Sequence, residues 1–425
     1  MSDLLKFFVK NGVYSSCRML FVVLVVAVML RTMWATFVGI VPVSDSLMYR
    51  EFANSIASGA GYAYPDGQLT VFWAVGASWF YALVKIVFGY SELPIMVVNV
   101  LVGAGLVFVS YRIASLYFSA GVALISAWIL AVWPVLIEFT TVYASEVLFA
   151  GFIAASIAMW ASRKGSYWMR SVVWGALLCI ATYVRPTALP LFVVLPVLEY
   201  IRERNLKQVV TSFVLASCTA AILLAPWVVR NQQVFGAPVL VSANFGVNLW
   251  MGNNQHSDGG YMRLPDIQFA NEVERDRYFK KEAVEFIRAN PMWYLKLALR
   301  RAVMTYDRET IGVAWNEPAL RKLVGDRGLM VIKAVSTAYW WLVLTLAVCG
   351  VAVLLWRKKS NLLHPLVVVS AFFFVVPILT VGQDRYHMPL NPFLAMFAAV
   401  ALDAAWKRFS AGRSAGRVVN EPQSV

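Results

Sequence analysis

Two carboxylates stand where long apolar runs of the sequence end or begin. Asp45 follows the first apolar run, and Glu146 opens a later one. A carboxylate at the mouth of a membrane site can act as a general base toward a hydroxyl or an amine. Each acid also has a structural explanation, because Asp45 could cap the helix predicted just after it and Glu146 could stabilise a helix N-terminus. Taken singly, each acid is better explained by that structural role.

Three arginines occupy comparable positions. Arg185 separates two apolar runs, Arg230 ends another, and Arg385 lies between the last two. The planar guanidinium can bond two phosphate oxygens at once, and a phospholipid-type substrate in the outer leaflet would need such contacts. An arginine at the membrane surface can equally extend its charged end into water, which explains each of the three as well when taken singly. These arginines are the candidates for binding a lipid phosphate.

The remaining polar residues show no further catalytic pattern. The histidines lack metal-ligand spacing, and we interpret His256, His364 and His387 as structural. The four cysteines are scattered, which supports neither a disulfide framework nor a metal site. No Walker loop, dinucleotide-binding glycine pattern or Asp-x-Asp pair occurs, so an activated substrate would not arrive as a cytoplasmic nucleotide. Arg31 lies inside the first apolar run, where a charge is costly and requires a partner or a polar cavity.

The composition indicates which elements must position these residues. Of the 425 residues, 60% are hydrophobic and 14% are charged, whereas an average soluble domain carries about a quarter charged residues. The mean hydropathy is +0.66. A net charge of +14 would suggest nucleic-acid binding in a soluble protein, but here the basic residues lie in short gaps between apolar runs. We therefore predict an all-α polytopic membrane protein.

Ten apolar runs are long enough to cross a membrane as helices, for which about 20 residues suffice. They begin near Met19, Leu93, Ala120, Val147, Ser171, Thr187, Val209, Ala334, Leu362 and Met388. A further run, residues 69–89, is apolar but contains Lys85. We interpret it as a juxtamembrane or re-entrant helix, because an eleventh span would leave the basic C-terminal tail outside the cell.

The distribution of basic residues orients these spans. Lys and Arg cluster in some of the gaps, at residues 6–18, 163–170, 202–207, 357–359 and 407–417. Basic residues favour the cytoplasmic side of a membrane. Both termini should therefore lie in the cytoplasm.

Four regions follow from this topology. They are an N-terminal transmembrane module at residues 1–228 with a first external loop at 42–93, a large extracytoplasmic loop at 229–333, C-terminal transmembrane helices at 334–406, and a basic cytoplasmic tail at 407–425. Within the large loop, residues 272–288 predict an amphipathic helix. Residues 293–306 predict a second helix, of the kind that lies on a bilayer surface.

A series of short motifs runs through most of the chain, from about residue 40 to residue 392. The motifs are residues 43–49, 57–62, 65–67, 145–149, 183–187, 227–236, 247–254, 289–291 and 384–390. In this order they resemble the motifs of the membrane-embedded C-type glycosyltransferases (GT-C). The resemblance is to the bacterial branch related to protein O-mannosyltransferases and the lipid A aminoarabinose transferase. Each motif is short, so the order is the specific part.

This resemblance implies a transferase that moves a sugar, usually with inversion, from a polyprenyl-phosphate-linked donor to a protein, lipid or glycan acceptor. Asp45 would serve as the base or orient the acceptor, and Glu146 would be a second acid. Arg185 and Arg385 would bind the phosphate that leaves, with Arg230 as a third candidate. The bacterial branch implies the inner membrane, with the active site facing outward.

The sequence departs from the family pattern in two places. Relatives carry paired acids in the first loop, whereas Asp45 has no acid beside it. The resemblance therefore leaves open whether a divalent metal ion serves as a cofactor. A large folded C-terminal domain does not follow the last apolar run, which we interpret as evidence against oligosaccharyltransferase-like peptide recognition.

The alternative function is a transporter or flippase for a lipid-linked sugar, which would also need many spans and phosphate-binding arginines. That function predicts charged residues at the bilayer midplane of several helices, and often two repeated halves. Arg31 is the one such residue found, and no internal repeat is evident. The transferase is therefore the favoured interpretation.

Overall fold

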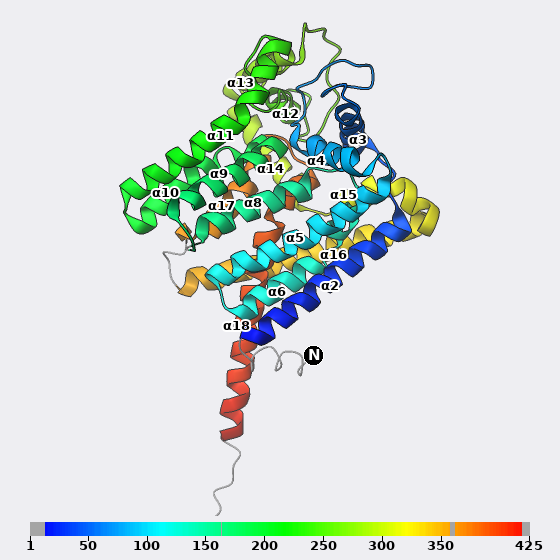
Figure 1. The fold of residues 1–425 in the computed structure, drawn as a ribbon. Helices are drawn as coiled ribbons and strands as arrows, with labels where there is room; N and C mark the ends of the chain where they lie inside the picture. The colour runs from blue at the N-terminus through cyan, green and yellow to red at the C-terminus, as the bar shows by residue number, and fades with distance from the viewer. Residues whose placement is uncertain (1–12, 163, 358–361, 419–425) are drawn as a thin grey trace, which may run out of the picture.

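The protein, seen in a computed structural model, is described for residues 13–162, 164–357 and 362–418. Within these residues every regular element is a helix. The helices α2 (Val13–Val38), α5 (Glu92–Tyr117) and α6 (Ala120–Ala131) run side by side with α16 (Glu317–Arg357) (Figure 1). The predicted all-α fold class is confirmed.

Each of the ten predicted apolar runs contributes to a helix, but the helices differ in length. In the described residues, six are long and apolar enough to cross a membrane alone: α2, α5, α9 (Tyr167–Val184), α11 (Leu206–Phe235), α16 and the helix that continues into α18 (Asn391–Val418). A seventh crossing forms if α6 and α7 (Pro134–Glu138) are one span bent by 57°. The others, α8 (Glu146–Ala161), α10 (Leu191–Glu203) and α17 (Pro365–Leu379), are shorter. The count of ten spans is therefore not confirmed.

The eleventh apolar run forms α4 (Gly76–Phe88). Its 13 residues extend only about 20 Å at 1.5 Å per residue, against a hydrocarbon core of about 30 Å. This length agrees with a partial helix at the membrane face. Helix α3 (Ser44–Ala57) packs against α4, so together they form the helical part of the predicted first external loop.

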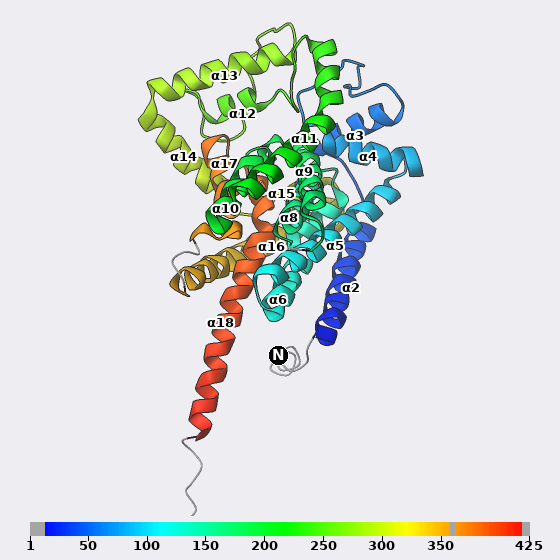
Figure 2. The same cartoon turned by 60° about the vertical axis from the view of Figure 1, so that its left-hand side comes forward.

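The large loop folds into helices α12 (Phe245–Gly252), α13 (Glu272–Ala289), α14 (Pro291–Tyr306) and α15 (Ile311–Trp315). Helices α13 and α14 coincide in sequence with the two helices predicted in this loop. The side chain of Asn271 begins α13 by accepting hydrogen bonds from the amides of Val273 and Glu274, each at 3.0 Å. Helices α12 and α13 lie together at one end of the molecule, and α18 extends toward the opposite end (Figures 1 and 2).

The predicted region boundaries fall inside helices. Helix α11 continues past residue 228 to Phe235, α16 begins at Glu317 rather than near residue 334, and α18 continues past residue 406 to Val418. Apolar runs mark where a helix meets lipid, whereas the hydrogen-bonded helix can continue into water through polar residues. Residues 419–425 of the predicted tail lie outside the described residues.

Arg31, the charge inside the first apolar run, has the partner that its position requires. Its fully buried guanidinium donates to the carbonyl oxygens of Ala131 (3.0 Å), Leu130 (3.3 Å) and Ala27 (3.1 Å). Two of these carbonyls end α6, where the helix breaks before α7 and leaves its last carbonyls without helical partners. Arg31 therefore stabilises a bend between two helices.

Candidate active site

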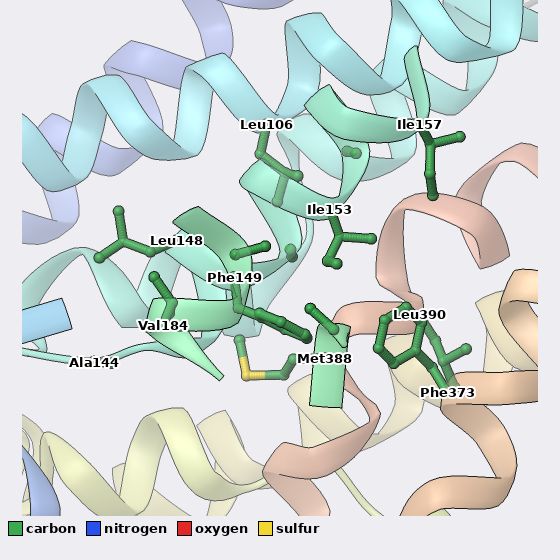
Figure 3. Close-up of a cluster of buried hydrophobic side chains, with 14 of the residues drawn as sticks. Leu106, Ala144, Leu148, Phe149, Ile153, Ile157, Val184, Phe373, Met388 and Leu390 are labelled. Atoms are coloured by element: carbon green, nitrogen blue, oxygen red, sulfur yellow. The ribbon is translucent and has the colours of Figure 1, made fainter. Parts of the chain in front are cut away.

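A buried apolar cluster supports the segments that carry the predicted site residues. It includes Ala144, Val184 and Met388, which lie one to three residues from Glu146, Arg185 and Arg385 (Figure 3). The rings of Phe149 and Phe373 meet edge to face within it, 5.7 Å apart. Because this core is close-packed, the polar residues at its border are held in place.

The structure brings four of the predicted residues together. The Asp45 carboxylate (Oδ2) is 2.7 Å from Nη2 of Arg385, and Glu146 Oε1 is 3.7 Å from Nη1 of the same arginine. Arg185 forms a direct ion pair with Glu146. Asp45, Glu146, Arg185 and Arg385 thus form one alternating chain of charges, which we call the carboxylate–arginine cluster.

Asp45 is held in the first turn of α3 and does not cap the helix. The capping position is Val43, which makes no side-chain cap bond. Ser44 has a φ of +51°, in the left-handed region that costs free energy for a residue other than glycine. The Asp45 side chain instead meets Arg385. The N-cap explanation is therefore wrong for this acid.

Glu146 begins α8, as its structural explanation requires, but it also has charged partners. Its side chain is fully buried between Arg185 and Arg385. The neighbouring Ser145 hydroxyl accepts from Nε of Arg185 at 2.9 Å and from the Tyr49 hydroxyl at 3.3 Å. Burial raises the pKa of Tyr49 to about 12, so this hydroxyl remains a neutral donor at physiological pH.

Arg385 lies in the 3₁₀ helix η4 (Asp384–Leu390), between α17 and α18. Its guanidinium carbon is 4.9 Å from the ring centre of Trp315 and 5.4 Å from that of Tyr386. Its Nε donates to the side-chain oxygen of Gln383 at 2.7 Å. Aromatic walls reduce the access of water and so strengthen the attraction of this arginine for an anion.

Arg230 lies elsewhere. It donates to the carbonyl oxygens of Thr70 (2.9 Å) and Tyr62 (3.3 Å), and its guanidinium packs on Trp227 at 4.8 Å. It lines a largely apolar cavity of about 270 Å³ together with Trp79 and other residues of α3, α4 and α11. No contact found among the described residues joins Arg230 to the carboxylate–arginine cluster.

Sequence reasoning missed several residues that complete the site. Ser145 and Tyr49 bond the cluster, and Trp315 covers Arg385. Ser145 could have been found because it precedes Glu146 at a helix start. Nothing in the sequence marked Glu309, which is fully buried and pairs with His387.

Each of the three histidines has a polar contact within the protein. His387 pairs with Glu309. His364 accepts from the amide of Leu366 at the start of α17, and the amide of His256 donates to the side chain of Asn254.

A divalent metal ion would need several side-chain ligands to be held by the protein alone. In the described part of the chain, no group of three or more His, Cys, Asp or Glu side chains could hold one. Both carboxylates of the cluster already face guanidinium groups. The positive charge near Asp45 and Glu146 is supplied by Arg185 and Arg385.

No family model matches this sequence, and no curated protein sequence matches it. Solved structures do match its fold. The oligosaccharyltransferase AglB from Archaeoglobus fulgidus, in complex with an inhibitory peptide and a dolichol-phosphate, is 13% identical with a TM-score of 0.56, over 97% of this chain and 53% of AglB. ArnT from Cupriavidus metallidurans, bound to undecaprenyl phosphate, is 13% identical with a TM-score of 0.54, over 94% of this chain and 63% of ArnT.

These likenesses show the fold, which this chain shares with AglB and ArnT. The chain spans about half the length of AglB and less than two thirds of ArnT. A further structure of the A. fulgidus oligosaccharyltransferase, in complex with Zn and sulfate, has a TM-score of 0.57 at 14% identity, over 92% of this chain and 49% of the other.

Proposed function

We propose that this chain is an integral membrane glycosyltransferase that moves a sugar from a polyprenyl-phosphate-linked donor to an acceptor on the extracytoplasmic face. The carboxylate–arginine cluster is the observation that carries this proposal. It places two cations and a partly exposed carboxylate side by side, within a fold shared with proteins that bind dolichol-phosphate or undecaprenyl phosphate. The cell membrane of a bacterium, with the site facing outward, is the proposed location.

Arg385 and Arg185 bind the donor phosphate in this proposal. When the bond between the sugar and the phosphate breaks, negative charge builds up on the departing phosphate. Two positioned guanidinium groups stabilise that charge more strongly in the transition state than in the bound donor, which accelerates the reaction. Glu146 holds both arginines at the same place, because it lies within ion-pair distance of each.

Asp45 acts as the base. The acceptor oxygen or nitrogen forms a bond to the anomeric carbon, the bond from that carbon to the phosphate oxygen breaks, and the acceptor proton passes to the Asp45 carboxylate. The polyprenyl phosphate leaves with the bonding electrons, and attack opposite the leaving group inverts the anomeric centre. Asp45 is the more exposed acid of the cluster, with 28% of its side chain accessible against 0% for Glu146, so an acceptor can reach it.

Arg230 remains a third candidate for the donor. Its place in the apolar cavity beside Trp79 and Trp227 supports contact with the lipid end of the donor near its phosphate. The proposed acceptor is a protein, a lipid or a glycan, and the experiment below distinguishes these three classes.

The test incubates the purified protein with defined polyprenyl-phosphate sugars and with protein, lipid and glycan acceptors, followed by mass analysis of the products. We expect release of polyprenyl phosphate together with a glycosylated acceptor, and loss of both in the Asp45→Asn variant. The flippase would be favoured, and the transferase contradicted, if an intact lipid-linked sugar moved across the membrane of proteoliposomes and no covalent product formed.

A further inference from the structure

The helix η4 that carries Arg385 is held on both sides of this arginine by the segment that joins α14 to α15. Before Arg385, the Asp384 carboxylate accepts from the amide (3.1 Å) and the hydroxyl (3.0 Å) of Thr310. After it, Nε2 of His387 lies 3.0 Å from Oε1 of Glu309. Arg385 itself packs against Trp315, the last residue of α15, which follows this segment. The segment is therefore one of the attachments of η4, which also packs against α8, α14 and α17.

The pair formed by Glu309 and His387 is the buried part of this attachment. Both side chains are fully buried. Nδ1 of His387 is 2.8 Å from the carbonyl oxygen of Thr305, which can only accept, so Nδ1 must carry a proton. The other carboxylate oxygen of Glu309 accepts from the indole N–H of Trp133 at 2.8 Å.

One further proton is therefore shared between Glu309 Oε1 and His387 Nε2, and the pair is neutral overall. Burial raises the pKa of the Glu309 carboxyl, which makes the proton easier to share. The indole ring of Trp340 stacks on His387 with the ring centres 3.9 Å apart. Every polar atom of the pair has a partner, so removing either member leaves a buried group unpaired.

No hydrogen bond or ion pair among the described residues joins this pair to Asp45, Glu146 or Arg185. Its connection to the cluster runs through η4, where His387 follows Arg385 by two residues. We propose that Glu309 and His387 are positioning residues that fix η4 so that Arg385 reaches Asp45 and Glu146 at the same time. This inference rests on the proposed transferase function, in which Arg385 stabilises the departing phosphate.

The positioning role of Glu309 should change the rate of transfer by an amount that kinetics can measure. A displacement of about 1 Å at a reacting group can cost about 10²-fold in rate. Glu309→Leu removes the partner of His387 and should lower kcat by about 10- to 100-fold, with a smaller change in KM. Glu309→Gln should remain within a few-fold of wild type, because the amide can still accept from Trp133 and donate to Nε2 of His387.

A double-mutant cycle separates positioning from an independent role. If Glu309 acts through Arg385, adding Glu309→Leu to Arg385→Ala should cause no further loss of kcat. The control is Glu272→Leu, which removes a mostly buried acid that is bonded to Tyr64 and Val71 of the first external loop and not to η4. The factor by which this control lowers kcat should multiply with the factor by which Arg385→Ala lowers it. The proposal would be overturned if the kcat losses of Glu309→Leu and Arg385→Ala also multiplied. It would likewise be overturned if Glu309→Gln lowered kcat as much as Glu309→Leu.

Two further measurements cover a variant that does not fold and a wild-type protein that transfers no sugar. If Glu309→Leu does not fold, His387→Phe takes its place, because the phenyl ring can keep the stack on Trp340 while losing both hydrogen bonds. If the wild-type protein transfers no sugar, the proposed function fails, and amide hydrogen exchange across residues 384–390 then tests the positioning alone. Exchange should rise in Glu309→Leu and not in Glu309→Gln, and unchanged exchange in both would contradict the attachment.

Discussion

The Asp45 carboxylate has a role that one substitution can test. In Asp45→Asn the amide oxygen can still accept from Arg385, but the side chain can no longer take a proton. We expect kcat to fall by about 10²–10⁴-fold while donor affinity is kept. The control is Asp66→Asn, an exposed acid of the same loop whose carboxylate accepts from the amide of Gln68, at 2.9 Å, and from no other group in the described part of the chain. Transfer by Asp45→Asn at the wild-type rate would remove Asp45 from the chemistry.

Arg385→Lys keeps the positive charge but loses the planar group that contacts Asp45, Glu146 and Gln383. A charge-assisted hydrogen bond contributes about 1.5–3 kcal/mol, so polyprenyl phosphate should bind roughly 10- to 150-fold more weakly. Equilibrium binding of the lipid phosphate to the purified protein measures this change. Arg321→Lys, at an exposed ion pair on α16, should leave the affinity unchanged. Equal affinities for the two variants would exclude Arg385 from the phosphate site.

The sequence identified the members of the cluster by position, and the fold explains why this was possible. Asp45, Glu146, Arg185 and Arg385 are charges that lie where apolar runs of the sequence end or begin, and a charge is costly near lipid unless it has a partner or a function. The same logic selected Arg230, which lies apart because the carbonyls of Thr70 and Tyr62 bind it. Contacts between loops of this kind depend on packing and leave no local pattern in the sequence.

At the scale of helices, the contact between α2 and α5 at Arg31 makes a prediction about stability. A Cβ atom on Gly103 of α5 would lie 2.4 Å from Nε of Arg31, whereas one on Gly105 would meet nothing within 4 Å. Arg31 cannot move away easily, because three carbonyls hold it. Gly→Ala in a helix otherwise gains about 1 kcal/mol. We therefore expect Gly103→Ala to lower the melting temperature in detergent and Gly105→Ala to keep or raise it.

The opposite order of these two melting temperatures would show that Arg31 does not pack against α5 as described. The pair of variants is well matched, because both change the same residue type on one helix by the same atoms. The guanidinium of Arg31 links this contact to the bend between α6 and α7. A lower melting temperature of Gly103→Ala would therefore reflect a disturbed bend between α6 and α7 as well as a disturbed contact with α5.

Helices with clear start signals were predictable, and those without them were not. Asn271 and the acids after it start α13, and Pro291 starts α14, so both follow from capping preferences. In contrast, η4 contains Pro389 and polar residues that predict a loop, and its contacts with Thr310, with Glu309 and with α8 are not evident from the sequence. The short length of α10 could not be predicted from the sequence either, because its apolar run includes residues that form η2 (Pro186–Ala188).

At the scale of the whole molecule, the first external loop, the large loop and η4 must lie on one side of the membrane. Glu272 at the start of α13 accepts from the hydroxyl of Tyr64 and the amide of Val71, each at 2.8 Å, and so joins the first two segments. Arg385 joins the third to Asp45. Helix α2 begins, and α18 ends, on the side away from α12 and α13 in both views (Figures 1 and 2).

This arrangement predicts opposite accessibility for the large loop and the C-terminal helix. In a cysteine-free background, Gln255→Cys should react with an impermeant maleimide on intact cells, and Ser414→Cys only after permeabilisation. Gln255 is suited to labelling because it is exposed, whereas the adjacent Asn254 is buried and bonded to the carbonyl of Trp250. Reaction of both cysteines from the same side would contradict the predicted orientation.

The same experiment decides whether α4 crosses the membrane. Gln68 precedes this helix and Tyr90 follows it, and both residues are exposed. If α4 is a partial helix at the outer face, cysteines at both positions should react on intact cells, because a helix of 13 residues is shorter than the roughly 20 needed to span the hydrocarbon core. If α4 crosses, only one of the two should react. That outcome would change the number of spans by one and place the N-terminus and the C-terminal helix on opposite sides, unless a further short helix such as α10 does not cross.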